Sequence, residues 1–227
     1  WVDTSDVAAL IGLPSFMLMD TPLNKGLISY EWLYNINTGL IIIFVLPLTR
    51  VFRKFATLNT ISIGIFITCI GLALCGLVNY GFVVITGFII YTFGEMIVNP
   101  KFTQYLGDIA DKSNASSYLS YLNLSWAFGL AGSGYLGGWL YHTYSEKAML
   151  ANRFLIDELN YTGKIELKDA FLTLQNQLNS DAITITKLLY DKYNPQAIWY
   201  IFIAIGFISI IGLLILSNKI NKIEKTN

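Results

Sequence analysis

Residues 81–107, GFVVITGFIIYTFGEMIVNPKFTQYLG, form a long apolar run that carries one carboxylate, Glu95, near its middle. A helix rises about 1.5 Å per residue, so roughly twenty residues cross the ~30 Å hydrocarbon core of a membrane. The run is long enough to span a bilayer with Glu95 well inside it. A carboxylate at that depth costs about 2.5 kcal/mol or more, so it normally faces a polar cavity or a partner rather than lipid.

The neighbours of Glu95 extend its polar character along one face of the helix. Tyr91, Glu95 and Asn99 follow one another at a spacing of four residues, which places them in one stripe. Pro100 lacks an N–H group and tends to kink a helix. This pattern predicts that Glu95 handles protons or substrate. The alternative is a neutral acid that is merely hydrogen-bonded to a neighbouring helix.

The composition indicates an integral membrane protein. The 227 residues are 54% hydrophobic and 13% charged, whereas about 25% of a typical soluble domain is charged. The formal net charge is zero and no patch interleaves basic and aromatic side chains, so we expect no nucleic-acid partner. The sequence contains no motif for a metal, a cofactor or an enzyme. We therefore expect neither a cofactor nor catalysis.

Apolar runs divide the chain into spans and polar links. They predict an all-α, multi-pass transmembrane bundle with spans at residues 32–51, 58–78, 82–106, 117–141 and 195–217. Residues 1–31 hold an apolar run too short to cross a bilayer, so we expect an extramembrane or interfacial segment. Residues 218–227 form a polar tail. Because the chain begins with Trp1 and shows no signal peptide, we expect a fragment or a processed chain.

Two further patterns concern packing. Apolar side chains recur at helical spacing over residues 167–178 and again over 183–189, so residues 142–194 are expected to form a small helical insert outside the membrane. The span before this insert carries small residues at a spacing of four, which allows another helix to approach closely. The small residues are Gly129, Ser133 and Gly137, with Gly134 and Gly138 as a second pair.

The basic residues predict the orientation of the chain. The links and the tail on one side of the membrane carry Arg50, Arg53, Lys54, Lys101, Lys112, Lys219, Lys222 and Lys225, whereas the short segments on the other side carry only Lys25. Basic residues gather on the cytoplasmic side, so the carboxyl terminus is expected there. The expected location is the plasma membrane or an inner membrane.

This order of spans resembles the carboxyl-terminal half of a major facilitator superfamily transporter, from about the eighth to the twelfth helix. The pair Gly94-Glu95 followed by Pro100, and the glycine-rich fourth span, are similar to the tenth and eleventh helices of its drug-efflux and proton-dependent oligopeptide branches. The family motif Gly-x-x-x-Asp-Arg-x-Gly-Arg-Arg has its basic positions at Arg50, Arg53 and Lys54. Its two glycines and its aspartate are replaced by Val45, Phe52 and Thr49.

The resemblance implies half of a major-facilitator-like fold, an amino-terminal half of the same protein as partner, and a cytoplasmic gate at Arg50, Arg53 and Lys54. In the oligopeptide branch the Gly-Glu pair supplies a carboxylate to the substrate site, a role that Glu95 would take. The tryptophan that this branch carries early in the eleventh helix is replaced by Tyr121-Leu122. The remaining candidates for a substrate or proton site are Tyr91, Asn99, Asn35, Asn37, Asn123 and Trp126.

Secondary active transport of a small solute by alternating access, coupled to protons through Glu95, is therefore the expected function. A membrane receptor or scaffold, whose insert at residues 142–194 binds a partner outside the membrane, is the alternative. Deletion of the insert separates the two hypotheses, because a receptor would lose its function whereas a transporter would keep solute flux.

Overall fold

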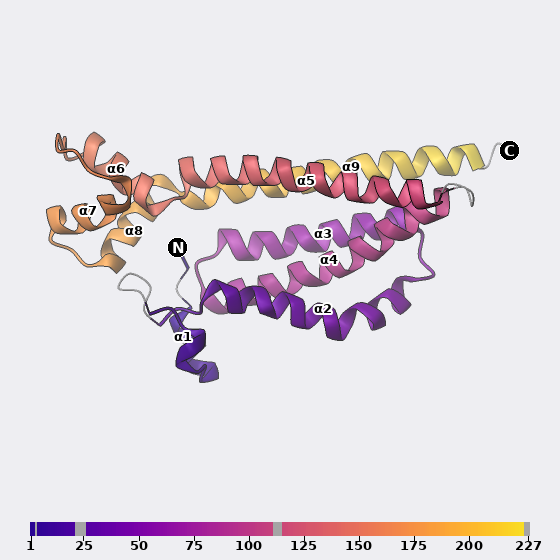
Figure 1. The fold of residues 1–227 in the computed structure, drawn as a ribbon, viewed down its shortest axis with the longest axis horizontal. Coiled ribbons are helices and arrows are strands. Elements are labelled where there is room, and N and C mark those ends of the chain that lie inside the picture. Colours follow the sequence, from indigo (N-terminus) through magenta and orange to yellow (C-terminus); the bar gives the residue numbers. More distant parts are fainter. Residues whose placement is uncertain (3, 21–25, 111–114, 225–227) are drawn as a thin grey trace. The chain divides into compact units, whose positions relative to one another are not determined.

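The structure is a computed structural model that describes residues 1, 2, 4–20, 26–110 and 115–224 (Figure 1). Within these ranges the regular elements are all helical, and the sole β feature is an isolated bridge between Leu18 and Ile28. The expectation of an all-α protein is thus confirmed. The chain divides into two compact units, one of residue 1 with residues 128–198 and one of residues 2–127 with 199–227. Each unit is described by itself.

Four helices of the described chain are long and apolar enough to cross a membrane: α2 (Tyr30–Phe52), α3 (Thr57–Leu77), α4 (Gly81–Ile109), and α9 (Ile198–Glu224) with the short 3₁₀ turn before it. The bounds of α2, α3 and α4 lie within three residues of the expected spans, whereas α9 continues seven residues past the expected end at residue 217. Large apolar side chains point outward from them, as shown by Ile42, which is 73% exposed, and Ile208, which is 69% exposed. Contiguous apolar surface of this kind is typical of contact with lipid or with a protein partner. The chain is therefore a membrane protein by length and composition.

Helices α3 and α4 form an antiparallel hairpin joined by residues 78–80 (Figure 1). Glycines bring the two backbones into direct contact. A Cβ atom on Gly71 would lie 2.6 Å from the Tyr91 Cα and 2.7 Å from the Gly87 carbonyl oxygen. One on Gly94 would lie 2.7 Å from the Gly64 carbonyl oxygen. Real Cβ atoms do not approach other atoms so closely, so only glycine fits at these positions.

The other two apolar helices of this unit pack on the two sides of the hairpin. Helix α2 lies along α4, with the Phe44 and Phe93 rings 5.6 Å apart. Helix α9 runs antiparallel to α3, because Trp199 meets Gly76 near one end and Ser217 donates a hydrogen bond to Asn59 (3.0 Å) near the other. The hairpin is therefore the centre around which α2 and α9 are arranged.

Before α2, the chain forms the short helix α1 (Ser5–Ile11) and the 3₁₀ turn η1 (Ser15–Met17). The described part of residues 1–29 contains no helix long and apolar enough to cross a membrane, and the extramembrane or interfacial place of this segment stays a prediction. Helix α5 (Ala115–Tyr144) covers the expected fourth span, but it is not one of the four helices apolar enough to cross a membrane. Its place in the bilayer therefore stays a prediction.

The insert forms a helical unit with its own core. It contains α6 (Lys147–Asp157), α7 (Ala170–Leu178) and α8 (Ala182–Tyr193), together with the 3₁₀ turns η2 (Leu167–Asp169) and η3 (Pro195–Ala197). Fully buried leucines from all three helices meet in this core, namely Leu150, Leu155, Leu174 and Leu189. The amphipathic patterns over residues 167–178 and 183–189 thus mark real helices, whereas α6 was not expected as an element.

Candidate functional site

Glu95 lies at the midpoint of α4, fourteen residues from each end, which corresponds to roughly 21 Å of helix on either side. Its neighbours along the chain, Gly94 and Met96, are both buried, the first against α3. The Glu95 side chain is half-buried and turns toward α2 instead. The site therefore lies at the α2–α4 interface. The opposite face of α4 packs against α3 through its glycines.

Asn37 of α2 is the residue that joins the two helices at this point. Its side-chain amide donates one hydrogen bond to Glu95 Oε2 (3.2 Å) and another to the Thr92 hydroxyl (3.1 Å). Asn37 is only 9% exposed and Thr92 is fully buried. The Thr92 hydroxyl in turn donates to the Phe88 carbonyl oxygen at 2.9 Å. Both N–H groups of Asn37 are thereby satisfied, as a buried amide requires.

The chemistry of this cluster is that of a carboxylate held by neutral donors. An ion pair between Glu95 and a basic side chain is absent from the described residues, where the ion pairs lie between residues 142 and 192. Dry surroundings favour the neutral acid, whereas water or an approaching cation favours the carboxylate.

The other candidates from the sequence make no described hydrogen bond to Glu95, although Tyr91 lies one turn before it and interacts with it electrostatically. Tyr91 stacks its ring on Phe88, with the centroids 6.1 Å apart, and no described hydrogen bond joins it to Glu95. Asn99, Asn35, Asn123 and Trp126 are exposed side chains. In the described chain, none of these four is hydrogen-bonded to the Asn37–Glu95 pair. Of the two asparagines near the start of α2, Asn37 alone reaches the carboxylate.

The small residues of α5 are also placed differently from the α3–α4 glycines. Among the described residues, no atom beyond the local helix backbone lies within 4 Å of where a Cβ would stand on Gly129, Gly134 or Gly138. Ser133 is exposed and donates to the Leu130 carbonyl oxygen of its own helix, and Gly137 is half-buried. Helix packing on this ridge by another segment therefore stays a prediction. The close contacts between glycines lie in the α3–α4 hairpin instead.

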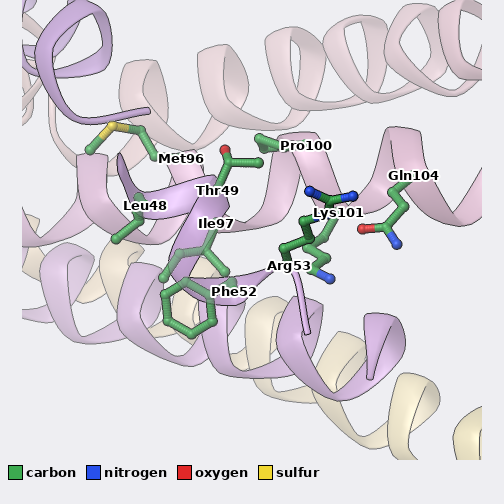
Figure 2. A pocket seen from close by; sticks show the side chains of 9 residues that line it. All are labelled: Leu48, Thr49, Phe52, Arg53, Met96, Ile97, Pro100, Lys101 and Gln104. Carbon is green, nitrogen blue, oxygen red and sulfur yellow. The ribbon is translucent and has the colours of Figure 1, made fainter. Parts of the chain in front are cut away.

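A small cavity of about 50 Å³ lies near the far end of the α2–α4 interface. Figure 2 shows its two ends: Arg53, Lys101 and Gln104 gather at one, and Leu48, Phe52, Met96 and Ile97 at the other. Lys101 is only 4% exposed, and its ammonium group donates to the Phe55 carbonyl oxygen at 3.1 Å. It was expected among the basic residues of a link, but it is a buried residue of α4.

The three residues expected to form a gate lie where α2 ends. Arg50, Arg53 and Lys54 are all exposed, and Arg53 lines the cavity. Three of the basic residues that predicted the orientation, Lys25, Lys112 and Lys225, lie outside the described residues. Orientation and gating therefore stay predictions.

Sequence reasoning missed Thr92 and the burial of Lys101. Thr92 lies three residues before Glu95, so helical spacing could have placed it on the same face. Lys101 follows a proline within an apolar run, and that pattern alone does not say which side of the helix is covered. A group of three or more histidine, cysteine or acidic side chains that could hold a metal is absent from the described residues. No protein-family model, curated protein or solved structure matches the chain.

Proposed function

We propose that the chain is the carboxyl-terminal part of a secondary active transporter of the major facilitator type, and that Glu95 couples solute movement to protons. The hydrogen bond from Asn37 to Glu95 between α2 and α4 is the observation that supports the proposal most directly. It holds an ionisable group in the middle of an apolar helix. Intramembrane carboxylates are expensive and usually functional.

The proposed mechanism is alternating access, in which this helix bundle rocks against a second bundle supplied by the amino-terminal half of the protein. When the central cavity between the two bundles opens, water reaches Glu95 and favours the carboxylate. When it closes, desolvation favours the neutral acid. Asn37 donates to Glu95 Oε2, and an oxygen of either the carboxylate or the neutral acid can accept this bond, so Asn37 would hold the carboxyl group in place while its charge changes. The substrate would be a small solute.

The test compares Glu95→Gln with the parent protein in proteoliposomes that also contain the amino-terminal half. A solute library is applied on a solid-supported membrane, and a transported solute is recognised by its proton-dependent current. Glutamine has the shape of glutamate and can still accept from Asn37, but it cannot titrate. We expect Glu95→Gln to lose proton-driven transport and to keep its fold.

Asp108→Asn is the matched control, because Asp108 is an exposed carboxylate near the end of the same helix. It should leave the current unchanged. Proton coupling at the parent level in Glu95→Gln would reject the proposal.

One observation favours the alternative function of a receptor or scaffold: the insert has a core of its own, made of buried leucines from α6, α7 and α8. Replacing residues 147–193 with a short linker distinguishes the two functions. A transporter keeps proton-driven flux after this replacement, whereas a receptor loses its extramembrane partner.

A further inference from the structure

We propose that the cavity between α2 and α4 binds the phosphate group of an anionic phospholipid or of free phosphate, through Lys101 and Arg53. The cavity begins at Met96, next to Glu95, and its basic residue Lys101 lies six residues further along α4; the proposal does not depend on transport.

Lys101 places a buried ammonium group beside the cavity. Its side chain is 4% exposed, and an ammonium group has three N–H donors. Its one hydrogen bond in the described chain goes to the Phe55 carbonyl oxygen. A buried cation that lacks a counter-charge is costly, and buried donors without acceptors add to that cost. Lys101 therefore calls for an anion on its remaining side.

The described residues supply no such anion. No carboxylate there lies within ion-pair distance of Lys101 or of Arg53. The acidic residue nearest in sequence, Asp108, accepts a hydrogen bond from Gln104 at 3.3 Å. Lys101 and Arg53 thus place two positive charges on one cavity, and no carboxylate of the described residues forms an ion pair with either.

The basic side chains and the size of the cavity both suit a phosphate group. A lysine ammonium and an arginine guanidinium are the two side chains that proteins use most for phosphate, because a phosphate offers several oxygen acceptors to both. The cavity volume of about 50 Å³ would hold roughly three to four water molecules. It therefore has room for one phosphate group and not for a large solute.

The apolar end of the cavity points to an amphiphile as one source of that phosphate. Leu48, Phe52, Met96 and Ile97 line the end away from the basic residues (Figure 2). Basic pockets between membrane-spanning helices bind anionic lipid head groups in this manner. An acyl chain could lie along the apolar side chains while the phosphate meets Lys101.

The experiment measures lipid and phosphate binding to the purified protein in a neutral detergent. Native mass spectrometry records retention of phosphatidylglycerol and of phosphatidylcholine, and inorganic phosphate is added as a competitor. We expect the parent protein to prefer phosphatidylglycerol, and Lys101→Gln to weaken its binding about tenfold, as loss of one charge-assisted hydrogen bond implies. Arg53→Gln should weaken it severalfold.

Two further variants separate charge from structure. Lys101→Arg keeps the charge and should keep the preference for phosphatidylglycerol. Lys54→Gln removes an exposed charge from the same turn, outside the cavity, and should have no effect. If Lys101→Gln does not fold, Arg53→Gln and Lys101→Arg still test the site, because Arg53 is exposed.

The competitor identifies the source of the phosphate. Displacement of phosphatidylglycerol by millimolar inorganic phosphate would show that the site takes free phosphate. Retention of the lipid in its presence would show that the site takes a phospholipid. The proposal is overturned if the parent protein binds neither phosphate nor phosphatidylglycerol in preference to phosphatidylcholine. It is also overturned if Arg53→Gln leaves the preference unchanged.

Discussion

Replacing Gly94 with alanine tests whether the α3–α4 backbone contact holds the bundle together. A Cβ atom at this position would lie 2.6 Å from the Thr68 nitrogen and 2.7 Å from the Gly64 carbonyl oxygen. Both are backbone atoms of α3 and cannot rotate away. The two helices must therefore separate by several tenths of an ångström or more along a contact that also includes Gly71 and Gly87.

The magnitude follows from two opposing effects. Overpacking a well-packed interface typically costs about 1–3 kcal/mol. Alanine recovers about 0.5–1 kcal/mol relative to glycine inside a helix. The expected net result for Gly94→Ala is a loss of about 1 kcal/mol in the free energy of unfolding, within a range of about 0–2.5 kcal/mol.

Gly107 provides the matched control, because it lies on the same helix and, among the described residues, no atom beyond its own stretch of backbone lies within 4 Å of where a Cβ would stand. Gly107→Ala should gain up to about 0.5–1 kcal/mol from helix propensity alone. Reversible unfolding in mixed micelles with increasing dodecyl sulfate measures both variants. The two substitutions should change stability in opposite directions. Equal unfolding midpoints for Gly94→Ala and Gly107→Ala would refute the packing argument.

Three other predictions concern the site and the insert. Asn37→Leu removes two interhelical hydrogen bonds. At up to about 1.7 kcal/mol for each bond, it should lower the free energy of unfolding in micelles by about 1–3 kcal/mol. Asn35→Leu, at an exposed position, should lower it little. Leu174→Ala creates a cavity in the core of the insert and should cost about 2–5 kcal/mol, measured by hydrogen exchange of α7, whereas Leu172, which is 50% exposed on the same helix, should tolerate alanine. Asp181 caps α8 by accepting a backbone N–H at 3.2 Å, and the hydrogen bonds from Thr184 lower its pKa below the usual 3.8. Its contribution is therefore present above about pH 3.8 and lost as the pH falls below that value, a dependence that Asp181→Asn should remove from thermal unfolding curves.

Each of these predictions has an opposing result. Equal stability of Asn37→Leu and Asn35→Leu would mean that the buried amide does not stabilise the α2–α4 contact. Equal protection from exchange after either leucine substitution would mean that the core of the insert is not packed as described. An unchanged acid transition in Asp181→Asn would mean that another group governs the stability of the insert at low pH.

Much of the helical organisation could be predicted from local pattern. Length and hydropathy placed α2, α3 and α4 to within three residues and the start of α9 to within three, although α9 ends seven residues later than expected. A helix that crosses a membrane must be long and apolar whatever it packs against. The amphipathic repeats likewise indicated α7 and α8. Helix α6 was missed, since its charged residues obscure a short apolar face.

The position of Glu95 inside a span is a property of the sequence, because it depends only on how many apolar residues lie on either side of it. Its partner is not such a property. Asn35 and Asn37 are two residues apart, so they point about 200° away from each other around α2, and the way α2 docks on α4 decides that Asn37 meets Glu95.

The same reason explains the glycines and Lys101. Helical spacing shows that Gly64 and Gly71 share one face of α3 and that Gly87 and Gly94 share one face of α4. These two faces meet only when α3 and α4 pack together. Lys101 is basic, as the residues of the links often are. It becomes buried because α2 and the turn at Phe55 cover it. Periodicity within one helix is a local property, whereas the choice of neighbour depends on the docking of two surfaces, which tertiary structure alone decides.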